Sequence, residues 1–388
     1  MNPFAKIPLA WLQLTRSKLR LVVALMGIAF AVVLVFMQLA FLDSLYESQT
    51  ALHRRLKADL VLINPRMKTL VNTTTFPRQY LYRTLNFDEV ASVNTVYHGQ
   101  WTLEYGDSVG GKGIVILGIN PENCPFEIAN FNQFAPRLRA KNSVLFDRNS
   151  DLKEYGDIVS ALASGQPVTA EINNQKVWIS GLVDFAGASF ADDGNLITSS
   201  TTFVNLLPER SENNITIGLI QLKPGVNHQK ALKKISEQLP KGVRVMTRSE
   251  FIDYEKHYWA TSAPIGFVFS VGVFVGFLVG VIIVYQILYS EISDHLPDYA
   301  VLKARGYKHR YFLNILFQEA LILAILGYIP GFAISLGLYE IVKHETALPM
   351  YMTFPRAVWV LLLTISMCFT SGSISMNKLR EADPADLF

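Results

Sequence analysis

Long apolar stretches divide this chain into segments suited to a membrane and a large segment suited to water. Residues 21–42 carry no charge over 22 positions, which is long enough to cross the hydrocarbon core of a bilayer as a helix. Three further apolar segments follow at residues 263–288, 311–342 and 357–376. The pattern predicts four transmembrane helices. The first is expected to be an uncleaved anchor, because its apolar core is longer than that of a signal peptide and no cleavage site follows it.

The stretch between the first two apolar segments, residues 43–262, has the composition of a soluble domain. Its first part, residues 44–57, has helical character and is expected to extend the first span. Alternating apolar positions between turn signals predict strands, and apolar spacing of three and four predicts a surface helix at 228–239. Strands are expected at 59–64, 100–105, 113–119, 168–172, 176–183, 215–222 and 243–246, and a short helix is expected to begin at 87–91.

These elements predict a membrane protein with four transmembrane α-helices and a large α+β extracytoplasmic domain inserted between the first and second helix. The order of strands and helices brings the two ends of the domain together, as its insertion between neighbouring spans requires. A second lobe is expected at about residues 121–206, where Gly, Asn and Asp are frequent.

The distribution of basic residues predicts the orientation. Residues 1–20 carry four basic residues and no acidic one, which favours an amphipathic helix on the anionic cytoplasmic face of the membrane. A disordered basic tail is the alternative. The segment 289–310 carries four more basic residues. Because cytoplasmic loops are rich in Lys and Arg, both of these segments and the tail 377–388 are expected in the cytoplasm, with residues 43–262 outside.

Composition and motifs exclude several kinds of function. The chain is 50% hydrophobic and 17% charged, unlike an ordinary soluble protein, and its net charge of +3 does not favour nucleic acid. Cys124 and Cys368 fall in different environments, so no internal disulfide is expected. The histidines lack metal-ligand spacing, and no P-loop or G-x-S-x-G motif occurs. We therefore expect no active site, metal or cofactor in this chain, and any ATP energy must come from another subunit.

The stretch YSEISDHLPDYAVLKARGYKHRYFLNILFQE, residues 289–319, is the most informative segment between two spans. Residues 300–304 favour a helix, Gly306 ends it, and cations gather in its last turn, as at many helix C-termini. We interpret residues 289–310 as a coupling segment that a cytoplasmic partner binds and moves. The residues expected to meet that partner are Pro297, Tyr299, Leu302, Lys303, Ala304, Arg305 and Gly306.

Three glycines in the second span share one helix face. Gly272, Gly276 and Gly280 recur every four residues, which permits close approach of another helix. That helix would belong to this chain or to a second copy in a homodimer. The alternative is that glycine is simply tolerated in membrane helices.

A carboxylate lies early in the third span, at Glu319. A charge in hydrocarbon is costly, so Glu319 is expected to face protein or the membrane interface. One interpretation is a brace, in which Glu319 pairs with Lys303, Arg305 or Arg310. The other is an interfacial side chain that reaches water.

Several motifs resemble those of the MacB/FtsX-type permeases of ABC transporters. LTRSKLRLVVALMGIAF resembles their entry into the first span, and LREADPADLF resembles their Asp-Pro-Ala ending. EISDHLPDYAVLKARGYKHRYF followed by FQEALILAILGYIPG resembles their coupling segment and third span. One span, a large outer domain and three further spans is also the layout of this family. The chain departs from the family at residues 298–300, where Glu-Ile-Gly is commoner, and it carries no fused ATPase domain.

The resemblance implies a non-catalytic permease subunit of the bacterial inner membrane, a homodimer bound to two copies of a separate ABC ATPase that holds ATP and Mg. It further implies a periplasmic adaptor protein and a TolC-like outer-membrane channel, with export of a lipid or amphiphile. Within the family the chain is most similar to permeases that export a glycolipid. The alternative is an FtsX-like signalling subunit that controls a periplasmic cell-wall hydrolase. An outer domain of about 220 residues favours export, because FtsX-like domains are usually smaller.

Overall fold

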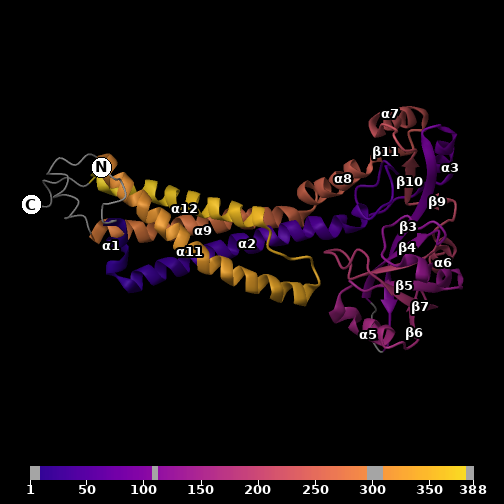
Figure 1. The fold of residues 1–388 in the computed structure, drawn as a ribbon, viewed down its shortest axis with the longest axis horizontal. Coiled ribbons are helices and arrows are strands. Elements are labelled where there is room, and N and C mark those ends of the chain that lie inside the picture. The colour runs from indigo at the N-terminus through magenta and orange to yellow at the C-terminus, as the bar shows by residue number, and fades with distance from the viewer. Residues whose placement is uncertain (1–8, 107–111, 295–308, 382–388) are drawn as a thin grey trace, which may run out of the picture. The chain divides into compact units, whose positions relative to one another are not determined.

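The computed structural model describes residues 9–106, 112–294 and 309–381 of the chain (Figure 1). The chain forms two compact units. One, here called the helical unit, comprises Met1–Asp43, Phe267–Ile341 and Met350–Phe388. The other, here called the sheet unit, comprises Ser44–Gly266 and Val342–Pro349.

Four long helices, which follow the four apolar segments, build the helical unit. Each is long and apolar enough to cross a membrane. A helix suits that environment because it satisfies its own backbone hydrogen bonds where lipid offers no partner. The long helices are α2 (Lys18–Arg54), α9 (Pro264–Asp294), α11 (His309–Thr346) and α12 (Phe354–Glu381), and the short α1 (Leu9–Arg16) precedes them.

The helices are longer than the spans expected from hydropathy. Helix α2 continues twelve residues beyond residue 42, through the stretch expected to extend the first span. Helix α9 continues to Asp294, so the first six residues of the coupling segment are helical. Where each helix enters and leaves the membrane stays a prediction.

The sheet unit contains a nine-stranded mixed sheet in the order β11-β1-β10-β3-β4-β8-β5-β7-β6 and a separate β2–β9 ribbon. The strands are β1 (Leu60–Ile63), β2 (Phe76–Pro77), β3 (Val90–Glu104), β4 (Lys112–Ile119), β5 (Ser143–Asp147), β6 (Val168–Ile172), β7 (Gln175–Val183), β8 (Asn195–Ser199), β9 (Asn214–Ile215), β10 (Ile217–Leu222) and β11 (Arg244–Thr247). The helices are α3 (Gln79–Tyr82), η1 (Arg83–Asn86), α4 (Phe131–Phe134), η2 (Ala135–Arg139), α5 (Leu152–Ala163), α6 (Ser200–Leu206), α7 (His228–Gln238) and α8 (Arg248–Thr261). Four long helices with an α+β unit between the first and second confirm the expected fold class.

The long strand β3 joins the two halves of the sheet. Its first half, up to Val96, pairs with β10, and its second half, from Tyr97, pairs with β4. Beyond β4 the pairs β4–β8 and β5–β7 are parallel, which requires crossover connections. Because one strand belongs to both halves, they are tied by backbone hydrogen bonds. A separate lobe at about 121–206 stays a prediction.

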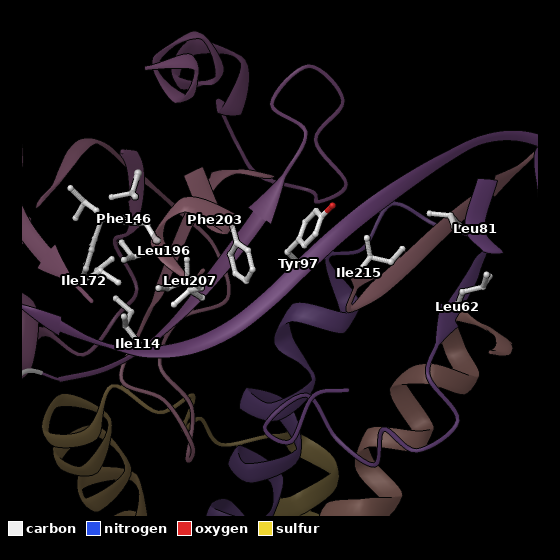
Figure 2. Packing of buried hydrophobic residues seen from close by; sticks show 14 of the residues in the cluster. Leu62, Leu81, Tyr97, Ile114, Phe146, Ile172, Leu196, Phe203, Leu207 and Ile215 are labelled. Atoms are coloured by element: carbon white, nitrogen blue, oxygen red, sulfur yellow. The ribbon is translucent and has the colours of Figure 1, made fainter. Parts of the chain in front are cut away.

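Side chains are buried on both faces of the sheet. In β1, Leu60 and Leu62 belong to one hydrophobic cluster, whereas Val61 and Ile63 belong to another. This division follows from the alternation of side chains along a strand. Figure 2 shows the first cluster spread along β3, with Leu62 and Leu81 near one end of the view and Ile172 and Phe146 near the other. The second cluster also includes Leu52 of α2 and Leu56, which follows the helix, so the end of α2 packs into the core of the sheet unit.

The strands expected from alternation are confirmed with bounds that differ by a few residues, except that β3 is much longer and that 215–222 is divided between β9 and β10. The helix expected to begin at 87–91 is wrong, because η1 ends at Asn86 and β3 begins at Val90. Alternation did not reveal β5 and β8. Every residue of β5, and four of the five in β8, are buried, so these strands show no polar-apolar alternation.

Helix α2 is the element against which small residues of two other helices pack in the helical unit. A Cβ added at Gly276 of α9 would lie 3.1 Å from the Val35 side chain of α2. On α11, a Cβ at Gly331 would lie 3.0 Å from the Ala29 carbonyl oxygen of α2. Gly272 and Gly280 likewise face α2, against Gln38 and Ala31, and Gly280 also contacts Met367 of α12. The three glycines expected on one helix face therefore meet residues of the same chain, and a role in a dimer stays a prediction.

We expect Gly280→Leu to lower the thermal stability of the purified full-length protein in detergent. The added side chain would overlap Met367 and press on Ala31, and overpacking of this kind costs about 1–3 kcal/mol. The measurement is the fraction of monodisperse protein that remains after heating.

Gly337→Leu is the matched control, because a Cβ at Gly337 meets no atom within 4 Å in the described structure. If Gly280→Leu and Gly337→Leu lose stability equally, close packing at Gly280 is not what stabilises these helices.

Candidate functional site

The expected coupling residues lie outside the described part of the chain. Pro297, Tyr299, Leu302, Lys303, Ala304, Arg305 and Gly306 all fall within residues 295–308. The flanking helices α9 and α11 are described, and both belong to the helical unit. Contact of these residues with a partner stays a prediction from the sequence.

Glu319 of α11 is completely buried in the helical unit. Neither of its carboxylate oxygens has a hydrogen-bond partner among the described residues. Glu291 of α9, also buried, is close enough to act on it electrostatically. Complete burial does not fit the interpretation in which this side chain reaches water. Lys303 and Arg305, two of the expected partners, lie outside the described residues, so the brace stays a prediction.

Arg356 of α12 holds three helices together within the helical unit. Its guanidinium donates to Asp43 Oδ2 at 2.7 and 3.1 Å and to the Tyr351 carbonyl oxygen at 2.8 Å. It also lies over the Tyr339 ring of α11, whose hydroxyl donates to the Phe36 carbonyl oxygen of α2 at 2.8 Å. Arg356 is buried although Asp43 is half exposed. These residues, the Arg356 cluster, fix α2 close to the residue where it leaves the helical unit.

A second polar cluster lies buried within the sheet unit, around Glu255 of α8. The Glu255 carboxylate accepts hydrogen bonds from the Thr69 hydroxyl, from the Leu70 amide at 3.3 Å and from Trp259 Nε1 at 2.9 Å. Glu255 Oε2 lies 3.4 Å from His53 Nε2. Burial by itself would raise the pKa of Glu255, but His53, together with the hydrogen bonds from Thr69 and Trp259, lowers it.

His53 stands in the last turn of α2 and is completely buried. Its ring packs against Phe251 of α8, with 4.4 Å between the ring centroids. The His53–Glu255 cluster therefore connects α2, through which the chain enters the sheet unit, to α8, through which it leaves. Removing one partner of a buried carboxylate typically costs about 1–3 kcal/mol or more, because the carboxylate is left without compensation. The cluster thus fixes the end of α2 to α8 within the sheet unit.

His98 of β3 lies near this cluster and is also buried. Its backbone N–H donates to the Thr216 hydroxyl at 3.0 Å, while Nδ1 has no partner among the described residues. Burial lowers the pKa of His98 to about 4, although Glu255 acts in the opposite direction. His98 is therefore neutral at pH 7. Together with Gln49 of α2 it lines a cavity of about 40 Å³.

The sequence contained no sign of the His53–Glu255 cluster and only a weak sign of the Arg356 cluster. His53 and Glu255 are 202 positions apart, and neither belongs to a motif with fixed spacing. Arg356 and Asp43 offered a weak signal, because each directly borders an apolar segment. Within the described ranges, no group of three or more His, Cys, Asp or Glu side chains could hold a metal ion.

We expect the stability of the sheet unit to fall as the pH falls from about 6.5 toward 4. The folded-state pKa of His98, about 4, lies below its ordinary value of 6.5, so the unfolded chain binds more protons in this range. Each pH unit then costs up to about 1.4 kcal/mol from this residue. The lowered pKa of Glu255 acts in the same sense, because its contribution is lost as the pH falls below about 4.5 and through its folded pKa.

Thermal unfolding of the full-length protein at pH 7 and pH 5 tests this expectation. His98→Gln should reduce the difference in melting temperature between the two pH values. His257→Gln is the control, since His257 is an exposed histidine of α8 and should leave the wild-type difference unchanged. An equal pH dependence in all three proteins would contradict a role for His98.

Two protein families match separate parts of the chain. Residues 21–238 match the MacB-like periplasmic core domain, and residues 270–384 match the C-terminal domain of FtsX-like permeases. The first match begins within α2 and ends with α7, so it leaves out β11 and α8, and the second covers most of α9 and all of α11 and α12.

Solved structures with similarity to the chain include two outer domains of such proteins. The periplasmic region of MacB from Actinobacillus actinomycetemcomitans has 11% sequence identity and a TM-score of 0.36, over 51% of this chain and 92% of that one. The extracellular domain of the noncanonical ABC-type transporter YknZ from Gram-positive bacteria has 14% identity and a TM-score of 0.33, over 49% of this chain and 98% of that one.

The family assignment rests on the two family matches, since the MacB-like match alone covers more than half of the chain. The four helices able to span a membrane agree with it. The chain is a multi-pass membrane protein that belongs to the MacB/FtsX-type family of ABC transporter permeases.

Proposed function

We propose that this chain is the permease subunit of a tripartite ABC exporter in the bacterial inner membrane. A homodimer binds a separate ABC ATPase at the coupling segment, which faces the cytoplasm together with both termini. The sheet unit lies in the periplasm, where it works with an adaptor protein and a TolC-like outer-membrane channel. Family membership supports the ATPase partner, and the basic residues of the coupling segment support the orientation.

The observation that carries this proposal is the continuity of α2. This helix runs unbroken from Lys18 to Arg54, so it belongs to both the helical unit and the sheet unit. The Arg356 cluster fixes it in one unit and the His53–Glu255 cluster fixes it in the other. A movement of α2 produced by the ATPase is then passed into the sheet unit, because packed elements transmit displacement. Cargo is taken up in the periplasm and pushed toward the channel.

The proposed cargo is a lipid or amphiphile with a sugar headgroup. This narrower proposal rests on the resemblance of the chain, including DYAVLKARGY at residues 298–307, to DevC. DevC is the permease of the cyanobacterial exporter for heterocyst envelope glycolipids. The proposed cargo rests on this overall likeness and not on a substrate motif.

Signalling to a periplasmic cell-wall hydrolase, as in FtsX-like proteins, is the second candidate. The match of residues 270–384 to the FtsX-like permease domain favours it as much as it favours export. The size of the sheet unit, which spans Ser44–Gly266, supports export, since a large outer domain is suited to docking an adaptor. Co-purification separates the two: an adaptor bound to the permease supports export, and a bound hydrolase supports signalling.

We expect Arg305→Glu to lower the ATPase activity of the assembled permease–ATPase complex at least fivefold. Reversing this charge would disturb the proposed contact, and close charge pairs at interfaces carry coupling energies of roughly 1.5–7 kcal/mol. The measurement is ATP hydrolysis by the purified complex, with permease expression checked in parallel.

Lys233→Glu is the matched control, because Lys233 is an exposed cation of α7 in the sheet unit. It should leave ATP hydrolysis close to the wild-type rate. Full ATPase activity in the Arg305→Glu complex would contradict the proposed coupling role of this segment.

We also expect a glycolipid to stimulate ATP hydrolysis when the complex is reconstituted in phospholipid vesicles. Vesicles of phosphatidylglycerol and phosphatidylethanolamine with and without digalactosyldiacylglycerol provide the comparison. An equal rate of ATP hydrolysis with and without the glycolipid would contradict the proposed cargo class. It would leave the proposed ATPase partnership intact.

A further inference from the structure

A large open cleft lies in the sheet unit, beside the β2–β9 ribbon. Its volume is about 750 Å³, within the range of about 300–1,000 Å³ found for small-molecule sites. One wall comes from α3 and η1, and the other comes from the segment that leads into β9. Nothing in the expected coupling role of the chain requires such a cleft.

Side-chain amides dominate the polar lining of the cleft. Gln79, Asn86, Asn213 and Asn214 all line it. Within the described residues, these amide groups make no hydrogen bond to another residue, and Gln79, Asn86 and Asn213 are exposed and therefore open to a ligand. Each amide offers both donors and an acceptor. Four such groups facing one space suit a ligand whose own groups both donate and accept, as hydroxyl groups do.

One of the two positive charges in the cleft is compensated. Arg78 lies 3.3 Å from Glu212, so its charge is shared with a carboxylate of the same region. Arg83 lies with its guanidinium 5.5 Å from the Tyr80 ring. A multiply charged anion is usually held by a cluster of free arginines, and here only Arg83 lacks a carboxylate partner among the lining residues that the structure describes. The lining therefore favours a neutral or weakly acidic polar ligand.

Tyr82 adds an apolar surface to this polar lining. The residue is 48% exposed, which is high for an aromatic side chain, and it lines the cleft. A tyrosine ring combines an apolar face with a polar tip. A sugar ring has the matching chemistry, with C–H groups on its faces and hydroxyl groups at its edge.

The walls of the cleft are held in place by backbone hydrogen bonds on one side and by a buried side chain on the other. The Arg78 amide donates to the Asn213 carbonyl oxygen at 2.8 Å, and Pro77 pairs with Asn214 in the ribbon. On the other wall, Leu81 is completely buried in the hydrophobic cluster beneath α3, and Figure 2 shows it on the same side of the view as Ile215. A preformed site binds more tightly because less ordering is required on binding.

We propose that this cleft is a saccharide-binding site, in which the four amides hold sugar hydroxyls and Tyr82 packs against the sugar ring. The further step, that the saccharide is the headgroup of the exported molecule, rests on the proposed function. The proposed function does not itself say which residues bind the cargo. The equilibrium binding itself does not need the ATPase, the adaptor or the coupling segment.

Saturation-transfer NMR with the full-length permease in phosphatidylcholine nanodiscs tests the proposal. The probes are the neutral oligosaccharides maltotriose, cellotriose and chitotriose, with inorganic phosphate titrated separately as a competitor. We expect transfer to at least one saccharide, and at least a tenfold weaker affinity in Asn86→Ala/Asn213→Ala/Asn214→Ala. Tyr82→Ala should weaken binding to a similar degree.

The control is Asn132→Ala, which removes an exposed amide from α4, outside the cleft. It should bind as the wild type does. No transfer to any of the three saccharides, or equal affinity in the triple variant and the control, overturns the proposal. If phosphate displaces the saccharide from the wild type but not from Arg83→Ala, the cleft is an anion site and the proposal is overturned. ATP hydrolysis by the assembled complex is measured separately, so failure of saccharide binding and failure of the coupling role are distinguishable.

Discussion

The structure depends on one helix that has to satisfy two environments. Over residues 21–42, α2 offers only uncharged side chains, as a bilayer requires. Over its last turns the same helix places Leu52 in a hydrophobic cluster of the sheet unit and His53 beside Glu255, and Leu56 joins that cluster just after the helix ends. Lipid favours any apolar surface, but a protein core requires complementary shape and paired polar groups. The first part of α2 therefore needs only an apolar surface, whereas its last turns need side chains that fit particular neighbours.

Different interactions hold α2 at its two ends. In the helical unit there is no hydrophobic driving force between helices, so close approach at small residues does the work, and glycines of α9 and α11 provide it. The Arg356 cluster adds directed hydrogen bonds there. In the sheet unit His53 and Glu255 are both buried, where a carboxylate without partners is costly. Both arrangements resist separation of α2 from its neighbours, which suits a helix proposed to transmit movement.

Glycine illustrates how far a local pattern leads. The four-residue spacing in α9 correctly indicated one face, but it did not say which helix meets that face. The structure places Val35 of α2 there. On α11, Gly327 and Gly331 have the same four-residue spacing, and they also pack against α2, at Ile28 and at the Ala29 backbone. Spacing determines which residues share a face, whereas the choice of partner depends on how all four helices fit together.

The sequence by itself determined the number of long apolar helices, the insertion of an α+β unit and most strands, because hydropathy and alternation report the local environment of consecutive residues. It could not reveal β5 and β8, which are buried on both faces and lack alternation. Only the tertiary structure decided the shared strand β3, the His53–Glu255 cluster and the amide-lined cleft. Each joins residues far apart in the chain, so its chemistry exists only once the backbone has folded and no periodic pattern encodes it.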